Sequence, residues 1–141
     1  MSDISRAKKF FETGKYTCVL CKDEQLYLSE KKGIAPVLDL IESGTSLEGF
    51  SAADKIIGRA AALLFILGGA VCVYGEVMSK GAAELFEKHG IRYSYEILTE
   101  RIINRTGTGI CPMEEATEGI DDPAEALEAI RKKRKELTGK D

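Results

Sequence analysis

The hydrophobic pattern of the first third of the chain predicts a helix, a hairpin and a second helix. The first helix is expected over residues 4–13, before a glycine that ends it. Residues 16–22 and 25–29 are rich in β-branched and aromatic side chains, and their two-residue connection indicates a hairpin. Pro36 then begins a short helix with one apolar face.

The middle of the chain carries its longest apolar run. Residues Ala53 to Leu67 are almost all apolar, which predicts a helix buried on most sides. A buried strand is expected over Ala70 to Tyr74, and a second helix begins after it, amphipathic over Ser79 to His89. Residues 91–95 predict a further strand. This alternation of strand and helix favours a mainly parallel sheet covered on both faces.

The last third is less regular. Residues 98–103 fit either a short helix or an extended segment, and 104–114 form a polar, glycine-bearing loop. A terminal helix is predicted over about residues 123–138. A chain of 141 residues fits one domain, 1–141. The predicted fold class is α/β, a three-layer α/β/α sandwich with an N-terminal hairpin and a mixed, mostly parallel sheet.

The composition of the chain argues against some classes of binding partner. A net charge of -3 argues against nucleic acid and anionic membranes, which require a basic face. The longest apolar run, Ala60 to Tyr74, spans about 15 residues, fewer than the roughly 20 that a membrane-spanning helix needs. The N-terminus has no apolar signal segment, so we expect a cytoplasmic protein with reduced thiols.

Three stretches, Ala53–Ala62, Tyr74–Ser79 and Ile103–Glu114, add a more specific pattern. Together with the order of elements, they resemble a small prokaryotic family of uncharacterised domains that is assigned to the cytidine deaminase-like fold. The resemblance covers roughly residues 2–118. It implies that fold and the position of a pocket, without implying an activity.

Zinc deaminases place a His or Cys with a Glu at the start of one helix and a Pro-Cys-x-x-Cys run at the start of the next. In this chain Asp54 stands near the first position, with no His or Cys beside it. Glu76 and Ser79 occupy the region of the second. Carboxylates without a thiolate or imidazole suit zinc poorly and magnesium better. We therefore expect no metal site and no cofactor.

Charged residues near the predicted helix starts are candidates for a binding site. Asp54 is suited to cap the helix, or to act as a base or hydrogen-bond acceptor. Lys55 and Arg59, four residues apart, would share one face of an otherwise apolar helix. A buried cation needs a partner, either Glu76 or the anion of a ligand, and the sequence leaves both open.

The glycine-bearing loop offers a second set of ligand contacts. Its amides at residues 107–109 could cradle a phosphate, with Arg105 as charge partner and Asn104 as reader of a base or ribose. Thr106 and, from the region of the second deaminase motif, Ser79 complete the predicted ligand-binding residues. The loop matches neither a Walker motif nor a dinucleotide fingerprint.

The cysteines divide by position. Cys18 and Cys21 have the spacing of a zinc knuckle or redox pair, but residues three apart on a strand point to opposite faces, which favours a structural role. Cys72 lies in an apolar strand and is expected in the core. Cys111 precedes a proline and a helix start, where the helix dipole would make its thiol a candidate nucleophile; a simple capped turn is the alternative. His89 is expected to cap a helix C-terminus.

Three functions fit these features. The first is binding, with or without modification, of a small nucleotide-like or other anionic metabolite at the carboxyl ends of the central strands, without zinc. The second is a non-catalytic binding or assembly module, a homo-oligomer included. The third is a thiol redox or sensor protein that uses Cys18, Cys21 and Cys111. The sequence does not decide whether the domain is an enzyme.

Overall fold

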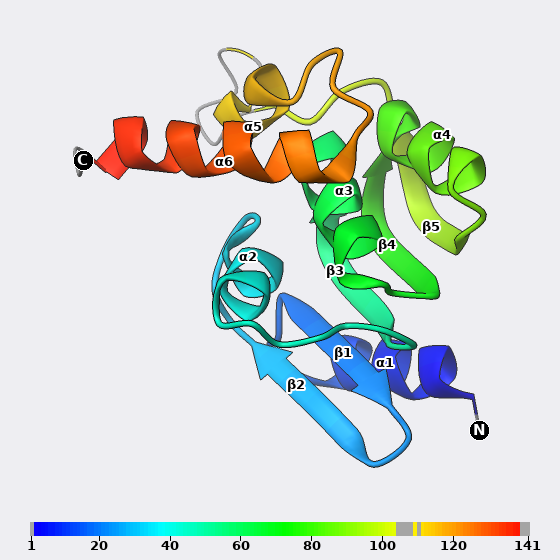
Figure 1. Ribbon diagram of the computed structural model, residues 1–141. Coiled ribbons are helices and arrows are strands. Elements are labelled where there is room, and N and C mark those ends of the chain that lie inside the picture. The colour runs from blue at the N-terminus through cyan, green and yellow to red at the C-terminus, as the bar shows by residue number, and fades with distance from the viewer. Residues whose placement is uncertain (1, 104–108, 110, 139–141) are drawn as a thin grey trace.

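The chain folds around a single five-stranded sheet with helices on both faces (Figure 1). The computed structural model describes residues 2–103, 109 and 111–138. The strands lie in the order β2-β1-β3-β4-β5. Their bounds are β1 Cys18–Lys22, β2 Gln25–Ser29, β3 Ser51–Ile57, β4 Cys72–Ser79 and β5 Arg92–Thr99.

The sheet is mixed, as predicted, and begins with the predicted hairpin. β1 pairs antiparallel with both β2 and β3, whereas β3, β4 and β5 run parallel to one another. Parallel pairing is therefore confined to the side of the sheet formed by β3, β4 and β5. The carboxyl ends of these three strands consequently meet at one edge of the molecule.

The helices divide unequally between the two faces. α1 alone packs on one face, against β1, β3 and β4, while α3 and α4 cover the other and α6 lies across the outside of α3 (Figure 1). No helix in the described part of the chain has the length and apolar character needed to cross a membrane. The helix bounds are α1 Asp3–Thr13, α2 Ala35–Glu42, α3 Arg59–Gly68, α4 Lys80–Lys88, α5 Pro112–Ala116 and α6 Pro123–Thr138.

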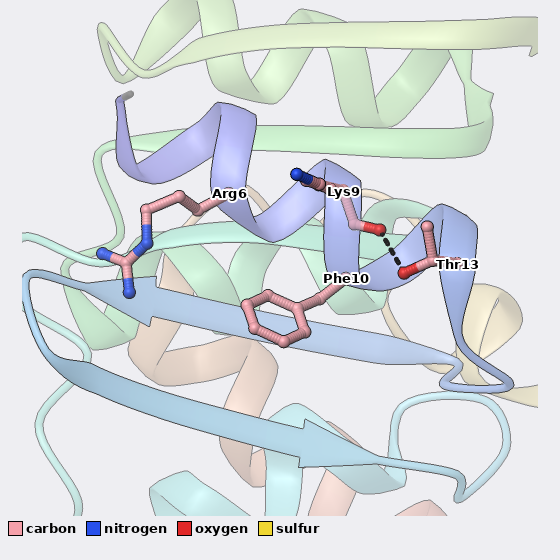
Figure 2. A pocket seen from close by; sticks show the side chains of 4 residues that line it. All are labelled: Arg6, Lys9, Phe10 and Thr13. Carbon is pink, nitrogen blue, oxygen red and sulfur yellow. Dashed lines mark hydrogen bonds between the residues drawn. The ribbon is translucent and has the colours of Figure 1, made fainter.

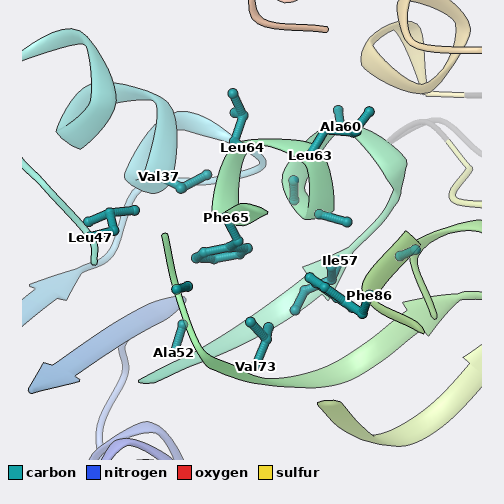
Figure 3. Close-up of a cluster of buried hydrophobic side chains, with 14 of the residues drawn as sticks. Val37, Leu47, Ala52, Ile57, Ala60, Leu63, Leu64, Phe65, Val73 and Phe86 are labelled. Carbon is teal, nitrogen blue, oxygen red and sulfur yellow. The ribbon is translucent and has the colours of Figure 1, made fainter. Parts of the chain in front are cut away.

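The main hydrophobic core lies between α3 and the sheet, because nearly every side chain of α3 is apolar. Figure 3 shows Phe65, Leu63 and Phe86 from the helices above Ile57 and Val73 of the strands. All five side chains are fully buried, and burial of each contributes about 1.5–3 kcal/mol. A smaller cluster lies under α1 on the opposite face.

The predicted helix over residues 53–67 is wrong in its first half. Residues through Ile57 form β3, and α3 begins only at Arg59. The segment pairs with β1 on one side and β4 on the other, so sheet hydrogen bonds satisfy its backbone. Gly75 likewise starts no helix. It lies inside β4, where a Cβ would stand 3.1 Å from Ile57 Cδ1, and α4 starts only after Ser79.

The alternation of side chains is broken once in β3 and once in β4. Ala52 and Ile57 both lie in the main core although five positions separate them, and the same holds for Val73 and Met78. Because the alternation of side chains breaks at the same level in both strands, Ile57 remains paired with Met78. The two strands therefore end side by side.

Candidate functional site

A cavity of about 300 Å³ lies where the carboxyl ends of β4 and β5 meet the N-terminal ends of α3 and α4. Parallel α/β sheets place ligand sites at this edge. Segments from α5 and from the loop before α6 close it. Its lining residues are Arg59, Ser79, Gly81, Glu100, Arg101, Ile102, Glu114, Glu118, Gly119 and Asp121.

Two abrupt strand-to-helix transitions shape the floor of the cavity. Ser79 ends β4 and caps α4, with its hydroxyl accepting a hydrogen bond from the Ala82 N–H at 3.1 Å. Gly58 joins β3 to α3, and a Cβ at this position would lie 2.3 Å from Oε1 of Glu114. Glycine is therefore required here for the close approach of another side chain.

Glu114 occupies the N-terminus of α3. Its Oε1 accepts the Arg59 N–H at 2.7 Å, and its Oε2 accepts the Ala60 N–H at 2.9 Å. These are two of the backbone donors that a helix cannot satisfy internally, and the helix dipole adds to the attraction. Hydrogen bonds of this charged kind contribute about 1.5–3 kcal/mol each. The protein thus supplies its own anion at this helix end.

The Arg59 side chain crosses the cavity floor. Its Nη2 donates to the Ile120 carbonyl at 2.6 Å and to Asp121 Oδ1 at 3.0 Å. Hydrogen bonds from Arg59 and Lys88 lower the pKa of Asp121. The Nε of Arg59 is buried and has no hydrogen-bond partner among the described residues. The guanidinium is therefore held in place through Nη2, while its buried Nε donates to none of the described residues.

Three further charged side chains line the cavity: Glu100, Arg101 and Glu118. Glu100 forms an ion pair with Lys80, and this hydrogen bond raises the pKa of Lys80. Arg101 and Glu118 form no ion pair within the described ranges. One positive and one negative side chain are thus available to a ligand.

The residues at the two helix starts do not fit zinc. The start of α3 offers Arg59, and the start of α4 offers Ser79, whose hydroxyl is engaged as a cap. Glu114 is engaged by two backbone amides. Among the residues with described positions, no group of three or more His, Cys, Asp or Glu side chains could hold a metal. Zinc requires thiolate, imidazole or free carboxylate ligands.

Of the ligand-binding residues predicted from sequence, the structure brings Arg59 and Ser79 to the cavity. The predicted Lys55 and Arg59 pair on one helix face is wrong, because Lys55 is exposed on β3. Glu76, half-buried on β4, is not the partner of Arg59; Asp121 is. Residues 104–106, which include the predicted Asn104, Arg105 and Thr106, lie outside the described residues.

Asp54 does not cap a helix, and its carboxyl does not line the cavity. It lies in β3, paired with Cys18 of β1, and only 4% of its surface is exposed. Burial raises its pKa to about 7. Hydrogen bonds from the Lys55 N–H, at 2.8 Å, and from the Cys18 thiol partly oppose this rise.

The cysteines do not form a common site. Cys18 and Cys21 lie in separate hydrophobic clusters on opposite faces of the sheet, which confirms the prediction from their spacing. Cys111 precedes α5 and is half-buried; its N–H donates to the Ile102 carbonyl at 3.1 Å, but the residue does not line the cavity. His89 ends α4, as predicted.

A larger hollow, of about 390 Å³, runs along α1 (Figure 2). Of the described residues, Arg6, Lys9, Phe10 and Thr13 line it, and the Thr13 hydroxyl donates to the Lys9 carbonyl within the helix. Because one helix supplies all its side chains, this hollow does not bring together groups from separate elements. The cavity at the strand ends is the better candidate.

Comparison with known proteins identifies the family. The family model described as "TM1506: Domain of unknown function (DUF1893)" matches residues 6–134. The chain belongs to the DUF1893 family. The crystal structure of a DUF1893 family protein, TM1506 from Thermotoga maritima, is similar with a TM-score of 0.85 and 27% sequence identity. The match covers 94% of this chain and 91% of that one. None of the curated proteins matches.

This result confirms the predicted membership of an uncharacterised domain family, and the DUF1893 fold extends over nearly the whole chain. Sequence reasoning missed Glu114 and Asp121, which hold α3 and Arg59. Glu114 lies 55 positions from Arg59, and no spacing rule connects them. The single local signal was Gly58, a glycine between two apolar segments.

Proposed function

We propose that this DUF1893 protein binds, without zinc, a small metabolite that carries both an anionic group and hydrogen-bond donors, as a nucleotide does. The observation that carries this proposal is a pair of cavity charges, Arg101 and Glu118, that form no ion pair with any described residue. Arg101 is suited to a phosphate or carboxylate, and Glu118 to an amino or hydroxyl group. A purely anionic ligand would leave the carboxylate unsatisfied.

The buried Nε of Arg59 supports the same ligand chemistry. A buried donor without a partner costs about 1–3 kcal/mol. A ligand oxygen that reached this atom would remove that penalty on binding. The side chain needs no reorganisation, because Ile120 and Asp121 already hold it.

The size of the cavity favours a compact ligand. Its volume of about 300 Å³ lies at the lower end of the range of about 300–1,000 Å³ that is typical of small-molecule sites. A nucleoside or nucleoside monophosphate is of suitable size, whereas a dinucleotide is too large. The position, between two helix starts at adjacent parallel strands, also supports the cytidine deaminase-like assignment of the fold.

Binding rather than catalysis is the proposed activity. Asp54 and Cys111 were the sequence candidates for base and nucleophile, and neither lines the cavity. The acids that do line it are mostly engaged: Glu114 by backbone amides, and Asp121 by Arg59. These two acids therefore hold the start of α3 and the Arg59 side chain in place.

The test is a calorimetric titration with nucleoside monophosphates and with the matching nucleosides, which lack the phosphate. Arg101→Gln is expected to weaken binding of the monophosphates about tenfold, with little effect on the nucleosides. Glu118→Gln should weaken both. Lys55→Gln is the matched control, because Lys55 does not line the cavity. Absence of saturable binding for every probe, or equal affinity in Arg101→Gln, would refute the proposal.

A further inference from the structure

β5 is the edge strand of the sheet that the described residues form. It pairs with β4 along one side only, and no described strand lies along the other. The Arg92 N–H donates toward β4, to the Val71 carbonyl at 3.3 Å. Because backbone groups alternate along a strand, those of Tyr93 and Tyr95 point to the free side. Such an edge is a template for another strand.

The sequence of this edge is nearly symmetric about Ser94. Reading outward from Ser94, Tyr93 corresponds to Tyr95, Arg92 to Glu96, and residue 91 to residue 97, both isoleucine. Within these seven residues the symmetry is broken at one pair of positions, 92 and 96, which carry opposite charges. An antiparallel copy with Ser94 opposite Ser94 would therefore place like residues together and opposite charges together.

The side chains agree with this arrangement. Arg92 and Glu96 are both exposed, and because they lie four positions apart on a strand they share one face. Neither has an ion-pair partner in the described part of the chain. Tyr95 is 42% exposed and Ile97 is 55% exposed. Tyr93 is held by Phe86, with ring centroids 6.0 Å apart, and by a hydrogen bond to Glu87. An antiparallel copy would therefore place the fixed ring of Tyr93 opposite an exposed Tyr95 ring.

We infer that β5 pairs antiparallel with β5 of a second copy of this chain, with a two-fold axis at Ser94 that joins the two sheets into one. The symmetry of the sequence favours a second copy over another protein, because only self-pairing requires residues 92 and 96 to be complementary. Each contact then occurs twice, including Arg92 with the partner's Glu96. This interface does not depend on the cavity or its ligand.

The symmetry makes the interface testable by charge exchange. Sedimentation velocity over about 1–500 µM should show a wild-type dimer that dissociates on dilution, since one strand of each copy makes a small contact. Arg92→Glu and Glu96→Arg should each raise the dimer dissociation constant about tenfold or more, because two attractive pairs become repulsive. Lys55→Glu, the same charge change two strands away, should leave it unchanged.

An equal mixture of the Arg92→Glu and Glu96→Arg chains should dimerise again, because one then carries two acids and the other two bases at these positions. The double variant R92E/E96R should also recover the wild-type dimer. Thermal melting of each variant checks that it is folded. A wild-type monomer at the highest concentration, a dimer insensitive to either single reversal, or a mixture that stays monomeric would each overturn the inference.

Discussion

Asp54 is the residue through which we expect pH to act most strongly on stability. Its carboxyl is buried in the middle of the sheet, and burial raises its pKa from 3.8 to about 7. Replacing it by asparagine keeps an oxygen to accept the Lys55 N–H and removes the ionisation. The variant Asp54→Asn therefore removes the pH dependence that this carboxyl contributes.

The sign follows from proton binding. Below about pH 4 the carboxyl is protonated in both the folded and unfolded states, so its contribution to stability is fully present. Between about pH 4 and about pH 7 the folded state holds a proton that the unfolded state has lost, so stability falls as pH rises. A difference of about 3 pH units, at about 1.4 kcal/mol each, gives a loss of about 4 kcal/mol. Domains of this size are stable by about 5–15 kcal/mol, so the loss is large.

The assay is urea unfolding of the wild type and Asp54→Asn between about pH 4 and about pH 8. The free energy of unfolding of the wild type should fall relative to that of the variant across this range and level off above about pH 7. Asp39→Asn is the control, because a hydrogen bond from Lys31 lowers the pKa of Asp39, so its effect has the opposite sign and is confined to acid. Parallel pH profiles for the wild type and Asp54→Asn would refute the reasoning.

Two further predictions concern the helix start and the thiols. Glu114→Ala should destabilise the fold by about 3–6 kcal/mol, because it removes two charged hydrogen bonds of about 1.5–3 kcal/mol each, and Gly58→Ala should approach this loss by displacing Glu114. Urea unfolding of the two single variants and of the double variant should give a loss for the double variant smaller than the sum, and additive losses would contradict the contact. Cys72 is half-buried and does not lie in the core, contrary to the expectation from sequence, whereas Cys18 and Cys21 are fully buried. In the native protein Cys72 should therefore be alkylated faster than Cys18 and Cys21, as followed by mass spectrometry. Equal rates would show that Cys18 and Cys21 are open to solvent and would favour a redox role.

Local signals made much of the fold predictable. The first helix follows Ser2, whose hydroxyl accepts the Ser5 N–H, and the terminal helix starts at Pro123 as expected. The β-branched residues of the hairpin and its short turn were enough to predict it. The failure at β3 has a physical reason: an apolar segment followed by an apolar helix reads as one buried helix, and only Gly58 separates them.

The site was less predictable, because distant segments build it. Arg59 and Ser79 lie where two adjacent strands end together. Proximity to an apolar run singled out Arg59, whereas Ser79 was singled out by its place in the region of the second deaminase motif. Asp54 shared that proximity but faces the core, since a strand turns alternate residues to opposite sides. Glu114 and Asp121 come from segments after β5, whose return across α3 only tertiary packing determines.

The matched break in alternation in β3 and β4 restricts how the chain can change in length. A one-residue insertion or deletion in one strand alone would turn every following side chain to the other face, and would move Gly58 out of line with Ser79. A change of two residues, made at the same level of both strands, would keep both the facing of the side chains and the alignment. We therefore expect relatives to vary the lengths of these two strands together, and to tolerate single insertions freely only in the loops between them.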